Sequence, residues 1–142
     1  MIFVFLIALT LSSCSKINKN DAINFTEDLI DYIEQGEYDF AAELFCNNID
    51  NEGNTFPEFL DNAEKTMEID FQSEITIVEC IDYVSKYSGT HGTELCAFLD
   101  YNITIDGESA NLYINLIDNN DVLQCFFFSL EYNDEIYQYY CP

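Results

Sequence analysis

The sequence ELCAFLDYNITIDGESANLYINL, at positions 94–116, determines the fold. Apolar and polar residues alternate on both sides of Asp106-Gly107, a dipeptide that favours a two-residue hairpin turn. If these two residues form the loop, Ile105 lies beside Glu108 and the next pairs are Ile103 with Ala110, Tyr101 with Leu112, Leu99 with Ile114, and Ala97 with Leu116. A shift of one residue would set apolar side chains against polar ones, so the sequence predicts this hairpin and its register.

The alternation of apolar and polar residues continues in the flanking sequence. It predicts a strand at 71–81 before the hairpin, a long strand at 122–132 after it, and a last strand at 136–141. Polar turns are expected at 118–121 and at 133–134. The C-terminal half is therefore predicted to be an antiparallel meander.

Helical periodicity replaces this alternation in the N-terminal half. Asn24 is predicted to cap a first helix, with Glu27 at the capping-box position, and Gly36 is predicted to end it. A shorter helix is expected at 38–46, followed by a polar loop at 47–54.

A third helix is predicted to begin after Thr55. This residue can cap the helix, Pro57 is tolerated in the first turn, and Glu58 completes a capping box. One face of this helix is apolar and carries Phe56, Leu60, Ala63 and Met67. Three N-terminal helices followed by an antiparallel meander indicate the α+β fold class, with the helices packed on the sheet.

The charge of the chain is strongly acidic. Its 142 residues include 27 Asp and Glu, four Lys and no Arg, and the formal net charge is −23. Nucleic-acid binding is excluded because phosphate recognition needs clustered Lys and Arg. This charge suits a cationic protein or a cationic small-molecule ligand. The alternative is that the acids only keep the domain soluble.

The N-terminus has the features of an export signal. Residues 2–11 form an apolar run that has the length of a signal-peptide core and is too short to span a bilayer. The sequence LSSC at 11–14 follows it and resembles the lipobox of bacterial lipoproteins, which implies cleavage before Cys14 and acylation of its sulfur. No Lys or Arg precedes the apolar run, and an ordinary secretory signal cut near Ser13 or Ser15 is the alternative.

These features divide the chain into three parts. We expect a signal peptide at 1–13, a lipidated tether at 14–21 and a single α+β domain at 22–142. The mature protein is expected to be exported and held at the membrane through the acyl chains on Cys14. By the same resemblance, Ser15 after the cysteine favours the outer membrane over the cell membrane in a cell that has both.

The segment GEYDFAAELF at 36–45 lies between two predicted helices and ahead of the sheet. In this position it resembles small bacterial lipoproteins of the nuclear transport factor 2-like superfamily, over about residues 22–140. The resemblance implies a curved sheet wrapped around a helix as a cone, often with a pocket at its mouth, and a homodimer through the sheet. Ketosteroid isomerase and scytalone dehydratase are members, but many relatives only bind a ligand, so the fold does not give the function.

An enzyme of the isomerase kind needs a carboxylate base and an acid donor that converge in an apolar pocket. Asp100, Tyr101 and Tyr113 are the pocket candidates on the predicted strands. The alternative is that they are ordinary strand residues in a chain rich in acids and tyrosines. The one histidine, His91, is expected in a turn.

We expect no metal site and no cofactor. The loop that begins at Asn48 follows part of a calcium-binding frame, but Phe59 occupies the twelfth place, where a glutamate is required. The chain contains neither a CxxC motif nor a GxSxG motif.

Five cysteines follow the lipobox, and export favours disulfides between them. The candidates are Cys80 with Cys96, which flank one predicted turn, and Cys125 with Cys141, on strands joined by another. Cys46 is the expected unpaired thiol. Five choices of free thiol, each with three pairings, leave fifteen arrangements open. Five reduced thiols are the alternative.

These observations support two classes of function. The first is a lipid-anchored, non-catalytic binding module with an acidic surface, of which one version is an immunity-type inhibitor of a cationic envelope toxin. The second is a small-molecule enzyme, isomerase-like or dehydratase-like, that uses the cone pocket. An enclosed apolar cavity with a carboxylate would favour the enzyme, and a filled interior would favour the binding module.

Overall fold

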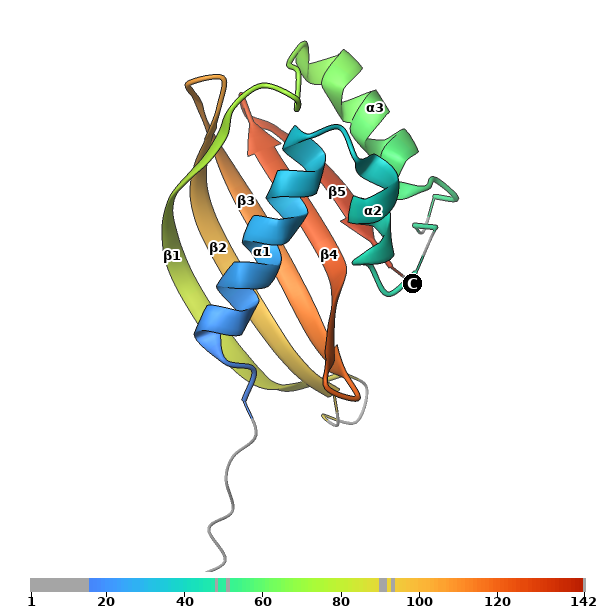
Figure 1. Ribbon diagram of the computed structural model, residues 1–142, viewed down its shortest axis with the longest axis vertical. Helices are drawn as coiled ribbons and strands as arrows, with labels where there is room; N and C mark the ends of the chain where they lie inside the picture. Colours follow the sequence, from blue (N-terminus) through green and yellow to red (C-terminus); the bar gives the residue numbers. More distant parts are fainter. Residues whose placement is uncertain (1–15, 48, 51, 90–91, 93, 142) are drawn as a thin grey trace, which may run out of the picture.

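The computed structural model describes residues 16–141, apart from 48, 51, 90, 91 and 93. The elements in chain order are α1 (Lys19–Glu34), α2 (Tyr38–Glu43), α3 (Phe56–Met67), β1 (Ile75–Ser88), β2 (Glu94–Ile105), β3 (Glu108–Asn119), β4 (Val122–Tyr132) and β5 (Glu135–Tyr140). The strands form one antiparallel sheet in the order β1-β2-β3-β4-β5, with the helices on one of its faces (Figure 1). The predicted α+β class is confirmed. Cys14 and His91 lie outside the described residues.

None of the described helices is long and apolar enough to cross a membrane.

The β2–β3 hairpin has the predicted register. Ile105 pairs with Glu108, and all four apolar pairs from Ile103–Ala110 to Ala97–Leu116 are confirmed. Asp106 and Gly107 both have positive φ values, of 51° and 80°, as a type I′ turn requires. The apolar partners on one side of this hairpin are buried, so the alternation in the sequence directly fixed which face meets the helices.

Helix α1 begins six residues before the predicted start. Asn18 is its N-cap, and the Asn18 side chain accepts a hydrogen bond of 2.8 Å from the backbone N–H of Asn20. Ile17 and Ala22 are buried in the core. Burial of these two residues extends the helix toward the N-terminus, and residues 19–21 of the predicted tether are helical.

Helices α2 and α3 differ in how well the sequence predicted them. Thr55 and Glu58 form the predicted capping box of α3. Helix α2 ends at Glu43, three residues earlier than predicted, because the chain then turns to run beside β4. There Phe45 forms a parallel bridge to Cys125, which takes it out of the helix.

Strand β1 begins and ends later than predicted. It covers Ile75–Ser88 instead of 71–81, because the segment before it is a turn closed by a hydrogen bond from Ser73 N to Asp70 O. Two register irregularities follow, at Val78 and Ile81, and both side chains are exposed. Such bulges add a residue to one strand, so the predicted strict alternation through 81 is wrong and the strand bends.

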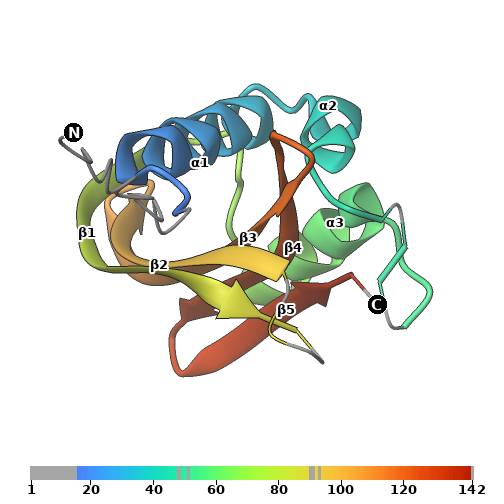
Figure 2. The same ribbon diagram turned by 90° about the horizontal axis from the view of Figure 1, so that it is seen from below.

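Figure 2 shows that the sheet is curved. Its two faces differ in the side chains that they carry. We call the face against the helices the helix-side face; its central residues are Leu99, Tyr101, Leu112, Ile114 and Leu130, all buried. We call the opposite one the open face; its central row is Asp82, Asp100, Tyr113, Ser129 and Gln138, which lie opposite one another across the five strands. Helix α1 covers β2 and β3, and α3 covers β4 and β5 with an aromatic cluster of Phe56, Phe59, Phe128 and Tyr139.

Candidate functional site

The space between the helices and the sheet is filled. An internal cavity of about 10 Å³ remains there, and only apolar side chains line it. This volume is about that of a single water position. Tyr101 lies on this helix-side face, where its hydroxyl donates a hydrogen bond of 3.0 Å to Thr26 Oγ1, and the Thr26 hydroxyl donates at 3.0 Å to the carbonyl of Ala22. Burial raises the pKa of Tyr101 to about 12, so this phenol stays neutral.

The sheet separates the three predicted pocket residues. Asp100 and Tyr113 lie opposite each other on the open face, whereas Tyr101 is buried on the helix-side face. Strand alternation alone requires this, because adjacent residues point to opposite faces. The three side chains therefore do not line one pocket.

Asp100 has an unusual surrounding on the open face. Its Oδ1 atom is buried and has no hydrogen-bond partner among the described residues. Burial, followed by repulsion from Asp82 and Glu131, raises the pKa of Asp100. Burial and the negative charges of Asp100 and Glu131 also raise the pKa of Tyr113. This row concentrates negative charge, and the nearby Lys86 on the same face lies over the Phe98 ring, with its Nζ 5.1 Å from the ring centroid.

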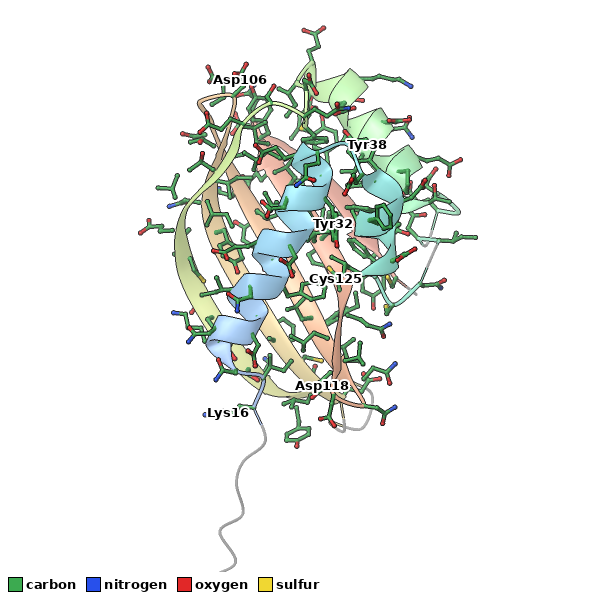
Figure 3. The ribbon with its side chains drawn as sticks, viewed as in Figure 1. Lys16, Tyr32, Tyr38, Asp106, Asp118 and Cys125 are labelled. Carbon is green, nitrogen blue, oxygen red and sulfur yellow. The ribbon has the colours of Figure 1, made fainter. Side chains whose placement is uncertain are left out.

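A large groove lies at one end of the open face. Its volume is about 830 Å³, and it extends between the β1–β2 turn and the β3–β4 turn, beside the end of β5. Paired positions of β2, β3 and β4 form its floor, namely Cys96, Ile117 and Gln124. Figure 3 shows Asp118 at this end of the sheet, whereas Asp106 lies at the opposite end.

The groove combines carboxylates with aromatic rings. Glu94, Asp118 and Asp121 are its acids, and Tyr87, Phe126 and Tyr140 are its aromatic residues. None of the described residues that line it is a lysine. Carboxylates attract a cation through its charge, and aromatic faces attract it through their quadrupole. The groove is therefore chemically suited to an ammonium or guanidinium group.

The β3–β4 turn fixes one wall of the groove. Asn120 and Asp121 both have positive φ values, of 54° and 65°, which Asn and Asp adopt more readily than most residues. The Asp118 carboxylate accepts a hydrogen bond of 2.8 Å from the Asp121 N–H. One carboxylate thus closes the turn, and the Asp121 side chain remains exposed at the groove.

The loop with the partial calcium frame is held by its own hydrogen bonds. Asp50 is buried, and its Oδ1 atom accepts from the N–H groups of Glu52 and Asn54, at 2.9 and 2.8 Å. Within the described residues, no group of three or more His, Cys, Asp or Glu side chains is arranged to hold a metal ion.

The five described cysteines are free thiols. Cys80 lies opposite Tyr101 and Cys96 lies opposite Lys86. Six positions on β1 therefore separate the two thiols, or about 20 Å at the usual rise per residue. A disulfide needs Cα atoms within about 7 Å, so the predicted pairing of Cys80 with Cys96 does not fit this register.

Cys125 and Cys141 do lie together, and Cys46, the predicted unpaired thiol, lies beside them. The Cys141 thiol donates to the carbonyl of Cys125, with a distance of 3.7 Å, and the backbone N–H of Cys46 donates to the same oxygen at 2.9 Å. No local sequence pattern indicates this contact, because it joins the segment after α2 to the edge of β4.

Comparison with protein-family models, with curated proteins and with solved structures finds no match to this chain.

Proposed function

We propose that this chain is an exported, lipid-anchored binding domain whose acidic groove takes a cationic side chain of a protein partner. The observation that carries the proposal is the groove itself, with three carboxylates, three aromatic rings and no lysine among its described lining residues. The net charge of −23 adds a long-range field that attracts a cationic protein. The apolar run and the lipobox-like LSSC at 11–14 support a location outside the cytoplasm.

The filled interior supports binding over small-molecule catalysis. An isomerase-like mechanism needs a base and an acid within one enclosed pocket. The internal cavity here holds about 10 Å³ and has no polar lining residue. Asp100 and Tyr101, the adjacent acid and phenol, lie on opposite faces of the sheet.

We also propose that the domain has a nuclear transport factor 2-like fold. The element order, the curved antiparallel sheet and the position of α1 across it support this assignment (Figures 1 and 2). In such a fold the cone interior would be the usual ligand site. Because side chains fill that space here, the binding site we propose is on the other face of the sheet.

An immunity-type inhibitor is the version of this function that we favour. A toxin with an exposed Lys or Arg would present the cation that the groove is suited to take, and the lipid anchor would hold the inhibitor where an envelope toxin acts. The alternative is that a second copy of this chain binds the open face and forms a homodimer. It would bring two strongly acidic surfaces together, which opposes association at low salt.

Binding is tested with two variants that remove equal charge. Glu94→Gln with Asp121→Asn removes two groove carboxylates, and Glu27→Gln with Asp28→Asn removes two exposed carboxylates from α1. The immobilised chain is used to capture cationic proteins from envelope extracts at low salt. A captured protein is then identified, purified and titrated against each variant by calorimetry.

We expect the groove variant to weaken the affinity at least tenfold and the α1 variant to weaken it less than threefold. Equal weakening by both variants would mean that the diffuse charge, and not the groove, binds the partner. Recovery of only a dimer of this chain, with no cationic protein captured, would contradict the proposal.

Export and lipid anchoring are tested separately by measuring the intact mass of the protein extracted from a membrane fraction. We expect a chain that begins at Cys14 and carries acyl groups. An unmodified chain that retains Met1 would contradict the proposed envelope location. The calorimetric titration of the groove variant would still test the binding site.

A further inference from the structure

A bulge in β4 brings two cysteines to the same edge of the sheet. The register of β3 and β4 shifts between Asn115 and Leu116, which leaves Phe126 as the extra residue of β4. Successive carbonyls of a regular strand point in opposite directions. Here the carbonyl of Cys125 accepts from Cys46 N and the next one, of Phe126, accepts from Cys141 N, both at 2.9 Å. The bulge thus places the backbones of Cys46 and Cys141 side by side along β4.

The side-chain contacts of Cys141 place its thiol beside the backbone at Cys46 and Asn47. The Cys141 thiol lies over the chain that follows Cys46, with its Sγ 3.8 Å from the carbonyl oxygen of Asn47. It also lies 3.7 Å from the Cys125 oxygen that binds the Cys46 N–H. Cys46 and Cys141 are therefore neighbours at the same edge of β4. Both line the acidic groove.

Cys125 is the third thiol of this cluster, but its position differs. Its Sγ donates to the carbonyl of Phe127 at 3.3 Å, so it points along its own strand. It is fully buried, whereas Cys46 is exposed. Disulfide exchange needs a sulfur that an incoming disulfide can reach, and Cys46 meets this requirement.

We infer that Cys46 and Cys141 are a redox site and that they form a disulfide with each other, leaving Cys125 reduced. The oxidant is a disulfide donor such as oxidised glutathione. The Cys46 thiolate attacks one sulfur of the donor and releases one glutathione thiol, and Cys141 then attacks the mixed disulfide and releases the second. The two protein thiols lose two electrons and two protons, which the two released thiols gain. This inference is independent of the proposed cationic partner.

The disulfide would close one end of the groove wall. It would tie the C-terminal end of β5 to the segment between α2 and α3, two regions that 94 residues of sequence separate. Partial desolvation of the Cys46 thiol and the neighbouring Cys141 raise the pKa of Cys46 to about 12. Since the thiolate is the attacking species, the rate of exchange should rise about tenfold for each pH unit across the neutral range.

The site is tested on the full chain with oxidised glutathione at pH 8.5, followed by quenching in acid, trypsin digestion without reductant and mass spectrometry. Cleavage after the lysines places Cys46 in the peptide 20–65 and Cys141 in the peptide 87–142. The Cys96→Ser and Cys125→Ser variants remove the other two thiols of the second peptide, and Cys141→Ser is the decisive variant.

We expect the peptides 20–65 and 87–142 to be joined in the wild type, in Cys96→Ser and in Cys125→Ser. The link should fall by more than tenfold in Cys141→Ser. Circular dichroism of each variant controls for folding, since Cys96, Cys125 and Cys141 are buried. A bond between Cys125 and Cys141, or a wild-type chain that stays fully reduced after prolonged exchange, would overturn the inference.

Discussion

The two faces of the sheet are built from the same strands and have opposite roles. The helix-side face is closed and mainly apolar, and the Tyr101 hydroxyl on it is hydrogen-bonded to Thr26 within the core. The open face carries the polar row from Asp82 to Gln138, which includes two aspartates and one tyrosine, and it ends in the groove. Stability therefore resides mainly on one face, and the chemistry available to a partner resides on the other.

The sharpest test of this comparison uses two isoleucines of β3. Ile114 is fully buried on the helix-side face, and Ile117 lies at the groove on the open face. We expect Ile114→Ala to lower the free energy of unfolding by about 3.5 kcal/mol, because it leaves a cavity in a filled core. Ile117→Ala should cost about 1 kcal/mol, since its side chain is only partly removed from water.

Urea unfolding followed by circular dichroism measures both values. A similar loss of unfolding free energy in both variants would contradict the difference between the two faces, because it would mean that the open face is covered in solution. A concentration-dependent loss at Ile117 alone would identify that cover as a second copy of the chain.

Two buried tyrosines provide the next test. The Tyr101 hydroxyl has a partner, and the Tyr139 hydroxyl, on the same face, has none among the described residues. Tyr101→Phe should therefore cost about 1 kcal/mol through the lost hydrogen bond. Tyr139→Phe should raise the stability by about 1 kcal/mol, because it removes a hydroxyl that is desolvated and unpaired. Thermal unfolding of the two variants should shift the midpoint in opposite directions, and a shift in the same direction would contradict this account.

The smallest effect is expected at Asp100 on the open face. Asp82 lies directly opposite it, and like charges in this position destabilise a strand pair, so Asp100→Asn should gain about 0.5 kcal/mol at pH 7. The pKa of Asp100 is raised in the folded protein above its ordinary value of 3.8. The folded state therefore prefers the protonated form, and the destabilisation by the charge is present above the raised pKa and disappears as the pH falls below 3.8.

Urea titrations at pH 7 and pH 3 check this prediction. The stability difference between Asp100→Asn and the wild type should vanish at the lower pH. Asp28→Asn, at an exposed position of α1, is the control and should change the stability little at either pH. A gain that persists at pH 3 would mean that packing, and not charge, is responsible.

Elements whose signals are local could be predicted from the amino-acid sequence alone. The β2–β3 register followed from alternation around Asp106-Gly107, and the start of α3 followed from Thr55 and Glu58, because turn and cap chemistry act within a few residues. The class of fold followed from the order of these elements.

The tertiary structure decided what depends on contacts between distant segments. Burial of Ile17 moved the start of α1, and the bulges at Val78 and Ile81 shifted the alternation of β1, although neither has a signal in the nearby sequence. The groove joins two turns and the end of β5, and the bulge at Phe126 brings Cys46 to Cys141. The alternation or helical periodicity of a segment predicts only the secondary structure of that segment. The groove and the Cys46–Cys141 contact form only because the curved sheet brings separate segments together.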